Sequence, residues 1–209
     1  MLKVGVLVSG GGTNLQAIID KINSGYIKNC EIVTVVASKK EVYALERAAK
    51  YSIPNICIPK KDYSSTVEYD AAILHHLQEN DVDLVVLAGF MIILGAKFMD
   101  AYKNKIINVH PSLIPAFCGR GFYGLKPHQA ALEYGVKVTG ATVHIVELET
   151  DAGPIIIQKA ININEDDTPE SLQKRVMEEV EWDILPEAVK LFAEGRVVIE
   201  GRITRIIKI

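Results

Sequence analysis

The chain has 209 residues, of which 49% are hydrophobic and 23% charged, so it can bury the core of one domain. Its formal net charge of −3 argues against a nucleic-acid-binding protein, because such proteins usually carry a basic surface. The three cysteines are too few and too scattered for a disulfide framework or a structural zinc site. We find no signal-peptide pattern and no apolar run near the roughly 20 residues that span a bilayer, and we expect a cytoplasmic protein that contacts no membrane.

In the first half of the chain, short apolar runs rich in β-branched residues alternate with helical patterns. Continuous apolar strands separated by helices are typical of a parallel sheet that is covered on both faces. We therefore expect a Rossmann-like arrangement, with the ligand beyond the carboxyl ends of the strands. Strands are predicted at residues 3–8, 31–37, 55–58, 84–88 and 105–109, and helices at 15–21, 42–51, 66–80 and 96–102.

A different pattern follows a loop that contains Gly119, Gly121 and Gly124. The predicted elements are a short helix at 127–134, strands at 136–146 and 154–163, a long helix at 169–193, and a hairpin of residues 197–199 and 202–209. The short loop between the first two strands favours antiparallel pairing, and Pro186 is expected to kink or break the long helix. The sequence predicts one α/β domain, residues 1–209, with a mostly parallel sheet, helices on both faces and an antiparallel C-terminal extension.

A glycine-rich loop follows the first predicted strand, with the sequence Ser9-Gly-Gly-Gly-Thr-Asn14. Three successive glycines allow a tight turn that points several N–H groups one way, and the next helix adds its partial positive charge. The loop lacks the Gly-Lys-Ser/Thr ending of a P-loop, and Leu15 occupies the third glycine position of a dinucleotide-binding motif. The pattern favours a single phosphate monoester, and a plain tight turn is the alternative.

Two polar residues, Asn108 and His110, end an otherwise apolar strand. They are two residues apart and therefore point to the same face. An amide and an imidazole side by side can stabilise an oxyanion, and the imidazole can also carry a proton. Taken alone, such a pair is also typical of a structural histidine beside a turn-capping asparagine. An acidic loop, residues 147–153, follows later, and a carboxylate from Asp151 near His110 would raise the pKa of that imidazole.

Together these motifs resemble the folate-dependent formyltransferases, and within them the phosphoribosylglycinamide formyltransferase branch, also called glycinamide ribonucleotide transformylase. The likeness covers nearly the whole chain, in order. It is most specific in Asn108-Val-His-Pro-Ser112 and in Thr142-Val-His144 followed by Asp151-Ala-Gly-Pro154. The Ser-Gly-x-Gly-Thr-Asn loop is what points to the glycinamide ribonucleotide branch.

The resemblance implies transfer of a formyl group from 10-formyltetrahydrofolate to the amine of 5'-phosphoribosylglycinamide, a step of purine biosynthesis that needs no metal. It implies a phosphate-binding half, about residues 1–100, and a catalytic and folate-binding half, about 101–209. The implied catalytic residues are Asn108, His110 and Asp151. The implied ribotide-binding residues are Gly12, Thr13, Asn14, Glu178 and Glu181, and the implied folate-binding residues are Thr66, Met91, Ile92, Ile93, Leu94, Asn108, Glu147, Leu148, Glu149, Thr150 and Asp151.

Three positions depart from the pattern of relatives. Ile92 and Thr66 stand where relatives often carry arginine, which leaves recognition of the folate's glutamate tail open. The loop at residues 116–126 looks longer than its counterpart in some relatives, and its glycines suggest a mobile lid.

Other functions remain open at the level of sequence. Hydrolysis of 10-formyltetrahydrofolate shares the Asn/His/Asp centre, but such hydrolases usually carry a further N-terminal domain. Methionyl-tRNA formyltransferases add a C-terminal tRNA-binding domain and a basic surface. A non-catalytic nucleotide-binding module is a further alternative, but it would give Asn108, His110 and Asp151 no role. A dehydrogenase would need a glycine at the position of Leu15, the third glycine of the dinucleotide-binding motif. The expected partners are small molecules, with no nucleic acid, and the chain is expected to be a monomer or a homodimer.

Overall fold

The computed structural model describes residues 1–208 and divides into two compact units, Met1–Asn108 and Val109–Ile209. The boundary falls inside one strand, β5 (Ile106–His110), two residues before its end. The organisation of both units as one domain stays a prediction. No helix within residues 1–208 is long and apolar enough to cross a membrane.

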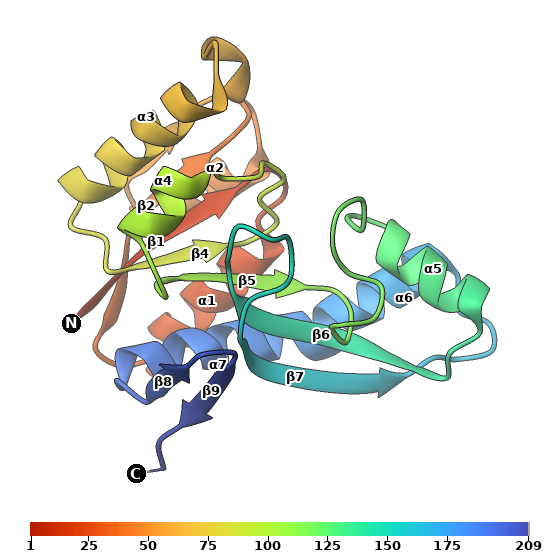
Figure 1. Ribbon diagram of the computed structural model, residues 1–209. Coiled ribbons are helices and arrows are strands. Elements are labelled where there is room, and N and C mark those ends of the chain that lie inside the picture. Colours follow the sequence, from red (N-terminus) through yellow and green to blue (C-terminus); the bar gives the residue numbers. More distant parts are fainter. Residues whose placement is uncertain (209) are drawn as a thin grey trace. The chain divides into compact units, whose positions relative to one another are not determined.

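The first unit is a parallel α/β unit (Figure 1). Its strands run in the order β3-β2-β1-β4-β5, and every neighbouring pair is parallel. The strands before β5 are β1 (Leu2–Val8), β2 (Cys30–Ala37), β3 (Asn55–Cys57) and β4 (Leu84–Leu87). The helical segments are α1 (Thr13–Asn23), α2 (Tyr43–Lys50), the 3-10 turn η1 (Lys60–Asp62), α3 (Thr66–Glu79) and α4 (Ala96–Ala101).

Apolar burial explains why these segments become a covered sheet. Every residue of β4 is buried, and β1 is buried from Val4 to Val8. Strands that are apolar on both faces need helices on both faces, because neither face can be left in water. Since all the strands are parallel, their carboxyl ends lie at the same edge of the sheet. The loop after β1, the segment after β4 and Asn108 in β5 are found at these ends.

The second unit is built on the antiparallel pair β6 (Val138–Ile145) and β7 (Ile155–Asn162). The short hairpin β8 (Val197–Glu200) and β9 (Ile203–Ile206) extends this pair through β9, so that the strand order is β6-β7-β9-β8. Two helices, α6 (Pro169–Val176) and α7 (Trp182–Ala193), pack along β6, and α7 also packs along β7 (Figure 1). A further helix, α5 (Lys126–Tyr134), precedes β6.

The predicted fold class is confirmed, and most predicted elements differ from the observed ones only at their ends. The long helix is the main correction. Its irregularity lies at a π-helical turn, η2 (Met177–Glu181), and Pro186 lies inside the regular helix α7. Proline removes one backbone donor, and the π-helical turn ends five residues before it. The predicted last strand ends at Ile206, and Ile209 lies outside the described residues.

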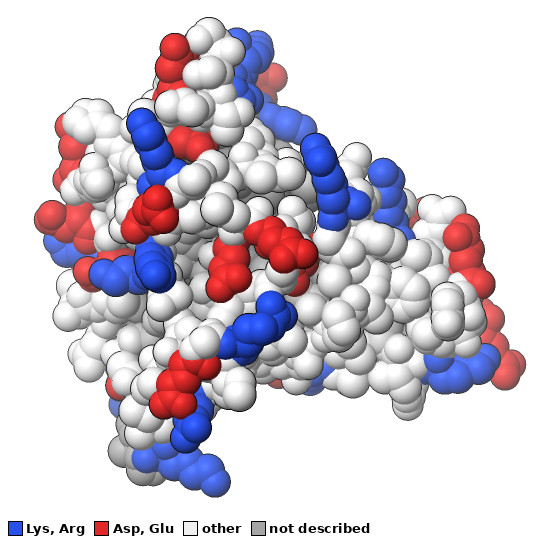
Figure 2. Space-filling view, viewed as in Figure 1, with Lys and Arg blue, Asp and Glu red and all other residues white. Residues whose placement is uncertain are grey.

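Charged side chains of both signs share the surface. On the face drawn in Figure 2, Lys and Arg side chains are interspersed with Asp and Glu side chains. No single sign of charge dominates this face.

Candidate active site

The glycine-rich loop connects β1 directly to α1. Gly12 is the N-cap residue of α1, with φ at 72°, and no side chain caps the helix there. A Cβ atom on Gly12 would lie 2.7 Å from Cβ of Ala44 in α2, so both the positive φ and the close approach of α2 require glycine. Gly10 and Gly11 are exposed. The backbone at the start of α1 is therefore accessible, as a phosphate site requires.

A second loop, residues 88–95, follows β4 and is fixed at two points by buried side chains. The hydroxyl of Ser9 accepts a hydrogen bond from the N–H of Met91 at 3.0 Å and lies 2.6 Å from the hydroxyl of Ser38. The carboxylate of Asp70 accepts one from the N–H of Gly95 at 2.7 Å. Between these points Met91 and Ile93 are exposed by 55% and 59%. The loop thus presents apolar side chains to solvent from a fixed backbone.

His110 ends β5 and is almost completely buried. Its Nε2 donates a hydrogen bond to the carbonyl oxygen of Phe117 at 3.0 Å, so Nε2 carries the hydrogen in this arrangement. Phe117 has a left-handed backbone, with φ at 49°, in the glycine-rich loop at residues 116–126. Nδ1 of His110 faces the carboxylate of Asp151 at 3.4 Å. Each ring nitrogen of this imidazole therefore faces an acceptor.

Asp151 lies in the turn between β6 and β7 and directs its carboxylate at two histidines. Its Oδ2 is 3.4 Å from Nδ1 of His110, and its Oδ1 is 3.6 Å from Nε2 of His144. Oδ2 also accepts a hydrogen bond from the N–H of Gly119 at 2.9 Å. The side chains of all three titratable residues are at most 9% exposed. The expected proximity of His110 and Asp151 is present, and the contact with His144 is an addition to it.

Burial and charge act in opposite directions on the two partners. Burial lowers the pKa of His110 below its ordinary value, and the Asp151 carboxylate offsets this only in part. The sequence-based expectation that Asp151 raises this pKa is confirmed, but removal of the ring from water outweighs the neighbouring charge and sets the net direction. For Asp151, burial alone would raise the pKa, but contacts with His144, His110 and the N–H of Gly119 bring it below its usual value. Near neutral pH the site holds a carboxylate beside a mainly neutral imidazole.

One buried histidine escaped the sequence analysis. His128 lies in the first turn of α5 and is only 1% exposed. Neither of its ring nitrogens has a hydrogen-bond partner among the described residues. Burial, and secondly the charge of His110, lower the pKa of His128 from 6.5 to about 4. The helix turn places this ring near the catalytic candidate, which spacing along the chain does not reveal.

Because the pKa of His128 is low in the folded state, the free energy of unfolding should fall as the pH is lowered. An unfolded chain binds this proton near pH 6.5 and the folded chain only near pH 4, so the folded state loses roughly 3 kcal/mol of stability as the pH falls through that window. A His128→Leu variant should lack this contribution. Denaturant unfolding at pH 7 and pH 4.5 is the measurement. If the wild type and the variant lose the same stability between these pH values, the explanation is wrong.

The remaining predicted residues are distributed as follows. Thr66 is the exposed first residue of α3. Glu147, Leu148 and Glu149 are exposed in the β6–β7 loop, with Thr150 half-buried beside them. In the π-helical turn η2, Glu178 is exposed, whereas Glu181 is 9% exposed. A π turn inside a helix is frequent at functional sites, and this one carries both predicted carboxylates.

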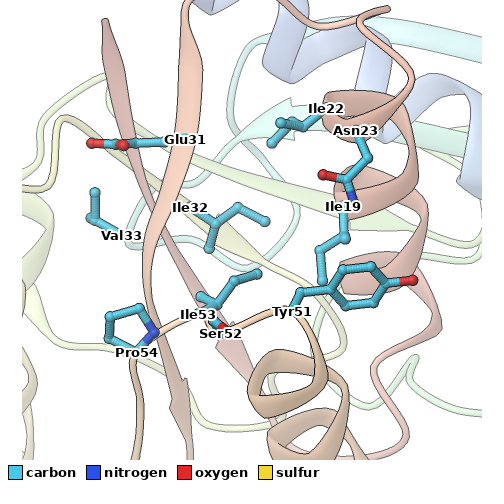
Figure 3. Close-up of a pocket in the computed structure, with 10 residues that line it drawn as sticks. All are labelled: Ile19, Ile22, Asn23, Glu31, Ile32, Val33, Tyr51, Ser52, Ile53 and Pro54. Atoms are coloured by element: carbon cyan, nitrogen blue, oxygen red, sulfur yellow. The ribbon is translucent and has the colours of Figure 1, made fainter.

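A shallow hollow of about 450 Å³ lies elsewhere in the first unit (Figure 3). Aliphatic side chains line much of it, among them Ile19, Ile22, Ile32 and Ile53. It adjoins the start of β2 and the residue before β3, at the amino ends of the strands. The glycine-rich loop lies at the opposite, carboxyl end, so the hollow is separate from the predicted phosphate site.

Comparison with known proteins defines the class. Residues 2–189 match the formyl transferase family model, and the chain belongs to this family. It is 42% identical, over 94% of its length and 89% of the relative's, to phosphoribosylglycinamide formyltransferase of Haemophilus influenzae. Glycinamide ribonucleotide transformylase 1 from Symbiobacterium toebii has a similar structure, with a TM-score of 0.94 and 45% identity, covering 100% of this chain and 95% of that one. The resemblance seen in the sequence is confirmed.

A solved hydrolase is also similar. A formyltetrahydrofolate deformylase from Pseudomonas syringae pv. tomato has a TM-score of 0.88 and 26% identity, covering 99% of this chain and 66% of that one. The fold is thus shared by proteins that are named for different reactions, so the reaction must be argued from the site.

Proposed function

We propose that this chain transfers the formyl group of 10-formyltetrahydrofolate to the primary amine of 5'-phosphoribosylglycinamide, a step of de novo purine synthesis. The observation that carries the proposal is the buried carboxylate of Asp151, which contacts His110 and His144. Asn108 precedes His110 by two residues on the same strand, which aims both side chains to one face. This is the group of residues that acyl transfer to an amine requires: oxyanion donors and a supported proton carrier.

The chemistry follows from the state of these groups. The amine attacks the formyl carbon, and a new C–N bond forms while the carbonyl oxygen becomes an oxyanion. Asn108 and Nε2–H of His110 donate hydrogen bonds to that oxygen. The bond from carbon to the folate nitrogen then breaks, and the proton lost by the amine ends on that nitrogen. Because the pKa of His110 is lowered, its neutral ring can take this proton on Nδ1, the nitrogen that carries no hydrogen. The proton reaches Nδ1 through the Asp151 carboxylate that faces it, and this carboxylate stabilises the imidazolium until the proton is passed on to the folate nitrogen.

The contact between His110 and Phe117 has a direct consequence for this reaction. Nε2–H of His110 donates to the carbonyl of Phe117, so a reacting formyl oxygen must replace that carbonyl as the acceptor. The loop at residues 116–126 carries Phe117, and we propose that it moves when substrate binds, as the mobile lid expected from the sequence would.

Substrate recognition is assigned to each unit separately. In the first unit, the backbone of Gly12, Thr13 and Asn14 binds the phosphate of the ribotide. Residues 91–94 and Asn108 contact the folate, with exposed Met91 and Ile93 offering apolar surface to its ring system. Thr66 is assigned to the folate's tail. In the second unit, Glu178 and Glu181 bind the ribotide, and Glu147, Leu148, Glu149, Thr150 and Asp151 contact the folate.

A spectrophotometric assay of a 10-formyl folate analogue, with and without the ribotide, tests the proposal. Folate product should form only when the ribotide is present. A His110→Ala variant should slow it by about 100-fold or more, since it loses both an oxyanion donor and the proton carrier. His75→Ala is the matched control, because His75 is exposed and pairs with Glu79 on its own helix. Normal turnover in His110→Ala would contradict the proposal.

Hydrolysis of the formyl folate is the second candidate, because the deformylase has a similar structure. The same site could place a water where the amine attacks. Product that appears at an equal rate without the ribotide would favour this hydrolysis over transfer.

A further inference from the structure

The carbonyl groups of the glycine-rich loop are held from one side by α2. The N–H of Ala44 donates to the carbonyl oxygen of Gly10 at 3.3 Å, and Nε of Arg47 donates to that of Gly11 at 2.8 Å. Ala44 also packs against Gly12, where a Cβ atom would clash. Two successive peptide groups are therefore fixed by the same face of one helix.

The orientation of these carbonyls determines where the neighbouring N–H groups point. In a trans peptide, the N–H of one residue points opposite to the carbonyl of the residue before it. With the carbonyls of Gly10 and Gly11 directed at α2, the N–H groups of Gly11 and Gly12 are directed away from it. The carbonyl of Gly12 accepts from the N–H of Gln16 in α1, so the third peptide is also fixed. The loop thus keeps consecutive donors turned outward, which is the arrangement that binds an anion.

Arg47 is itself fixed so that it can hold this position. Its Nη1 donates to the side-chain oxygen of Gln16 at 3.0 Å, and its guanidinium lies 4.7 Å from the centre of the Tyr43 ring. Gln16 is fixed in turn, because its amide donates to Asp20 at 2.8 Å and to the hydroxyl of Tyr51 at 3.1 Å. The planar fork of arginine makes two directed bonds here, which lysine cannot reproduce.

We propose that Arg47 is a positioning residue for the phosphate site: from behind the loop, it holds the Gly11 carbonyl so that the loop's N–H groups face the phosphate of the ribotide. Its positive charge also lies on the side of the loop opposite the bound anion and adds to the attraction. The inference rests on the proposed function and extends it to a residue that does not touch the substrate.

Calorimetric binding of two ligands to three variants tests this inference. The ligands are 5'-phosphoribosylglycinamide and the same compound without its phosphate. Arg47→Met should weaken binding of the ribotide by about tenfold, the usual size of one lost charge-assisted hydrogen bond. It should change binding of the phosphate-free compound by less than about twofold. A loss of affinity that is seen only for the ligand with a phosphate would show that Arg47 acts on phosphate binding. General damage to the fold would weaken the binding of both ligands alike.

Two further variants separate charge from geometry. Lys50→Met removes the same charge from an exposed position of α2 and should change ribotide binding by less than about twofold. Arg47→Lys keeps the charge and loses the paired hydrogen bonds, and we expect about threefold weaker binding of the ribotide. It also carries the test if Arg47→Met does not fold.

The outcomes are distinct. Equal weakening of both ligands in the folded Arg47 variants, or no weakening of the ribotide, would overturn the inference while leaving the proposed function intact. If Lys50→Met lost as much affinity for the ribotide as Arg47→Met, positive charge alone would explain the effect. That result would also overturn the inference. A wild-type chain that binds neither compound would overturn the proposed function and this inference together.

Discussion

An Asp151→Asn variant is expected to turn over the formyl folate and the ribotide at least about 100-fold more slowly than the wild type. The carboxylate faces Nδ1 of His110 at 3.4 Å, in a place from which water is largely excluded. When His110 takes a proton from the amine, a positive charge appears in this buried place, and the Asp151 carboxylate balances it. An amide of the same shape keeps the packing and removes the charge. Steady-state rates at saturating substrates are the measurement.

The same variant should lower the pKa of His110 further. The Asp151 carboxylate raises the pKa of His110, whereas burial lowers it by more. Removal of the carboxylate should therefore leave the pKa of His110 lower than in the wild type. The acid limb of the pH–rate profile should therefore move to lower pH than in the wild type, while the maximum rate drops. Titration of the His110 ring by NMR reads the shift directly. Asp166→Asn is the control, because Asp166 is an exposed carboxylate outside the site. Near-normal turnover with an unmoved His110 titration would refute this account of the proton path.

A Gly153→Ala variant is expected to lose about 3 kcal/mol or more of its free energy of unfolding. An added Cβ atom would lie 1.9 Å from the carbonyl oxygen of Ile145 and 2.9 Å from its carbonyl carbon, both of them backbone atoms. The strand cannot yield locally, because the N–H of Ile145 donates to the carbonyl oxygen of Pro154 at 2.8 Å. Relief therefore requires opening the turn that carries Asp151, and activity should fall together with stability.

Denaturant unfolding of Gly153→Ala and Gly10→Ala makes the comparison. Gly10 has no neighbouring atom within 4 Å of an added Cβ and no positive φ, so its variant should lose less than about 1 kcal/mol. A Gly153→Ala variant as stable as Gly10→Ala would mean that the β6–β7 turn adapts. In that case the position of Asp151 would not depend on this glycine.

The sequence was sufficient for the parallel unit because its strands are continuous apolar runs. The stretch from Leu84 to Leu87 has no polar residue, and such a run is buried wherever it pairs. The helix ends were less certain. α1 begins at Thr13, two residues earlier than predicted, because Gly12 takes a left-handed conformation that starts the helix without a capping side chain. The π turn at Met177–Glu181 leaves no such signal, since its residues are ordinary helix formers.

The parts of the candidate site that consist of residues close together in the sequence were predictable. The parts that are brought together by the tertiary fold were not. Asn108 and His110 share a strand, so their common face follows from the period of a strand. That Asp151 belongs to the same site as His110 was implied by the resemblance to the formyltransferases and not by the spacing along the chain. The burial of His128 and the contact of His144 with Asp151 depend on how α5, β6 and the β6–β7 turn pack. The same is true of the net pKa of His110, because a sequence shows the neighbouring charge but not the loss of water.

The central claim is direct transfer of the formyl group to the ribotide amine, and isotope labelling tests it most directly. The substrates would be 10-formyltetrahydrofolate labelled with ¹³C in the formyl group and ribotide labelled with ¹⁵N in its amine. NMR of the reaction mixture should show a ¹³C signal split by one-bond coupling to ¹⁵N, in an amount equal to the folate released. A ¹³C signal of free formate, with no coupling to ¹⁵N, would contradict the account and identify a hydrolase.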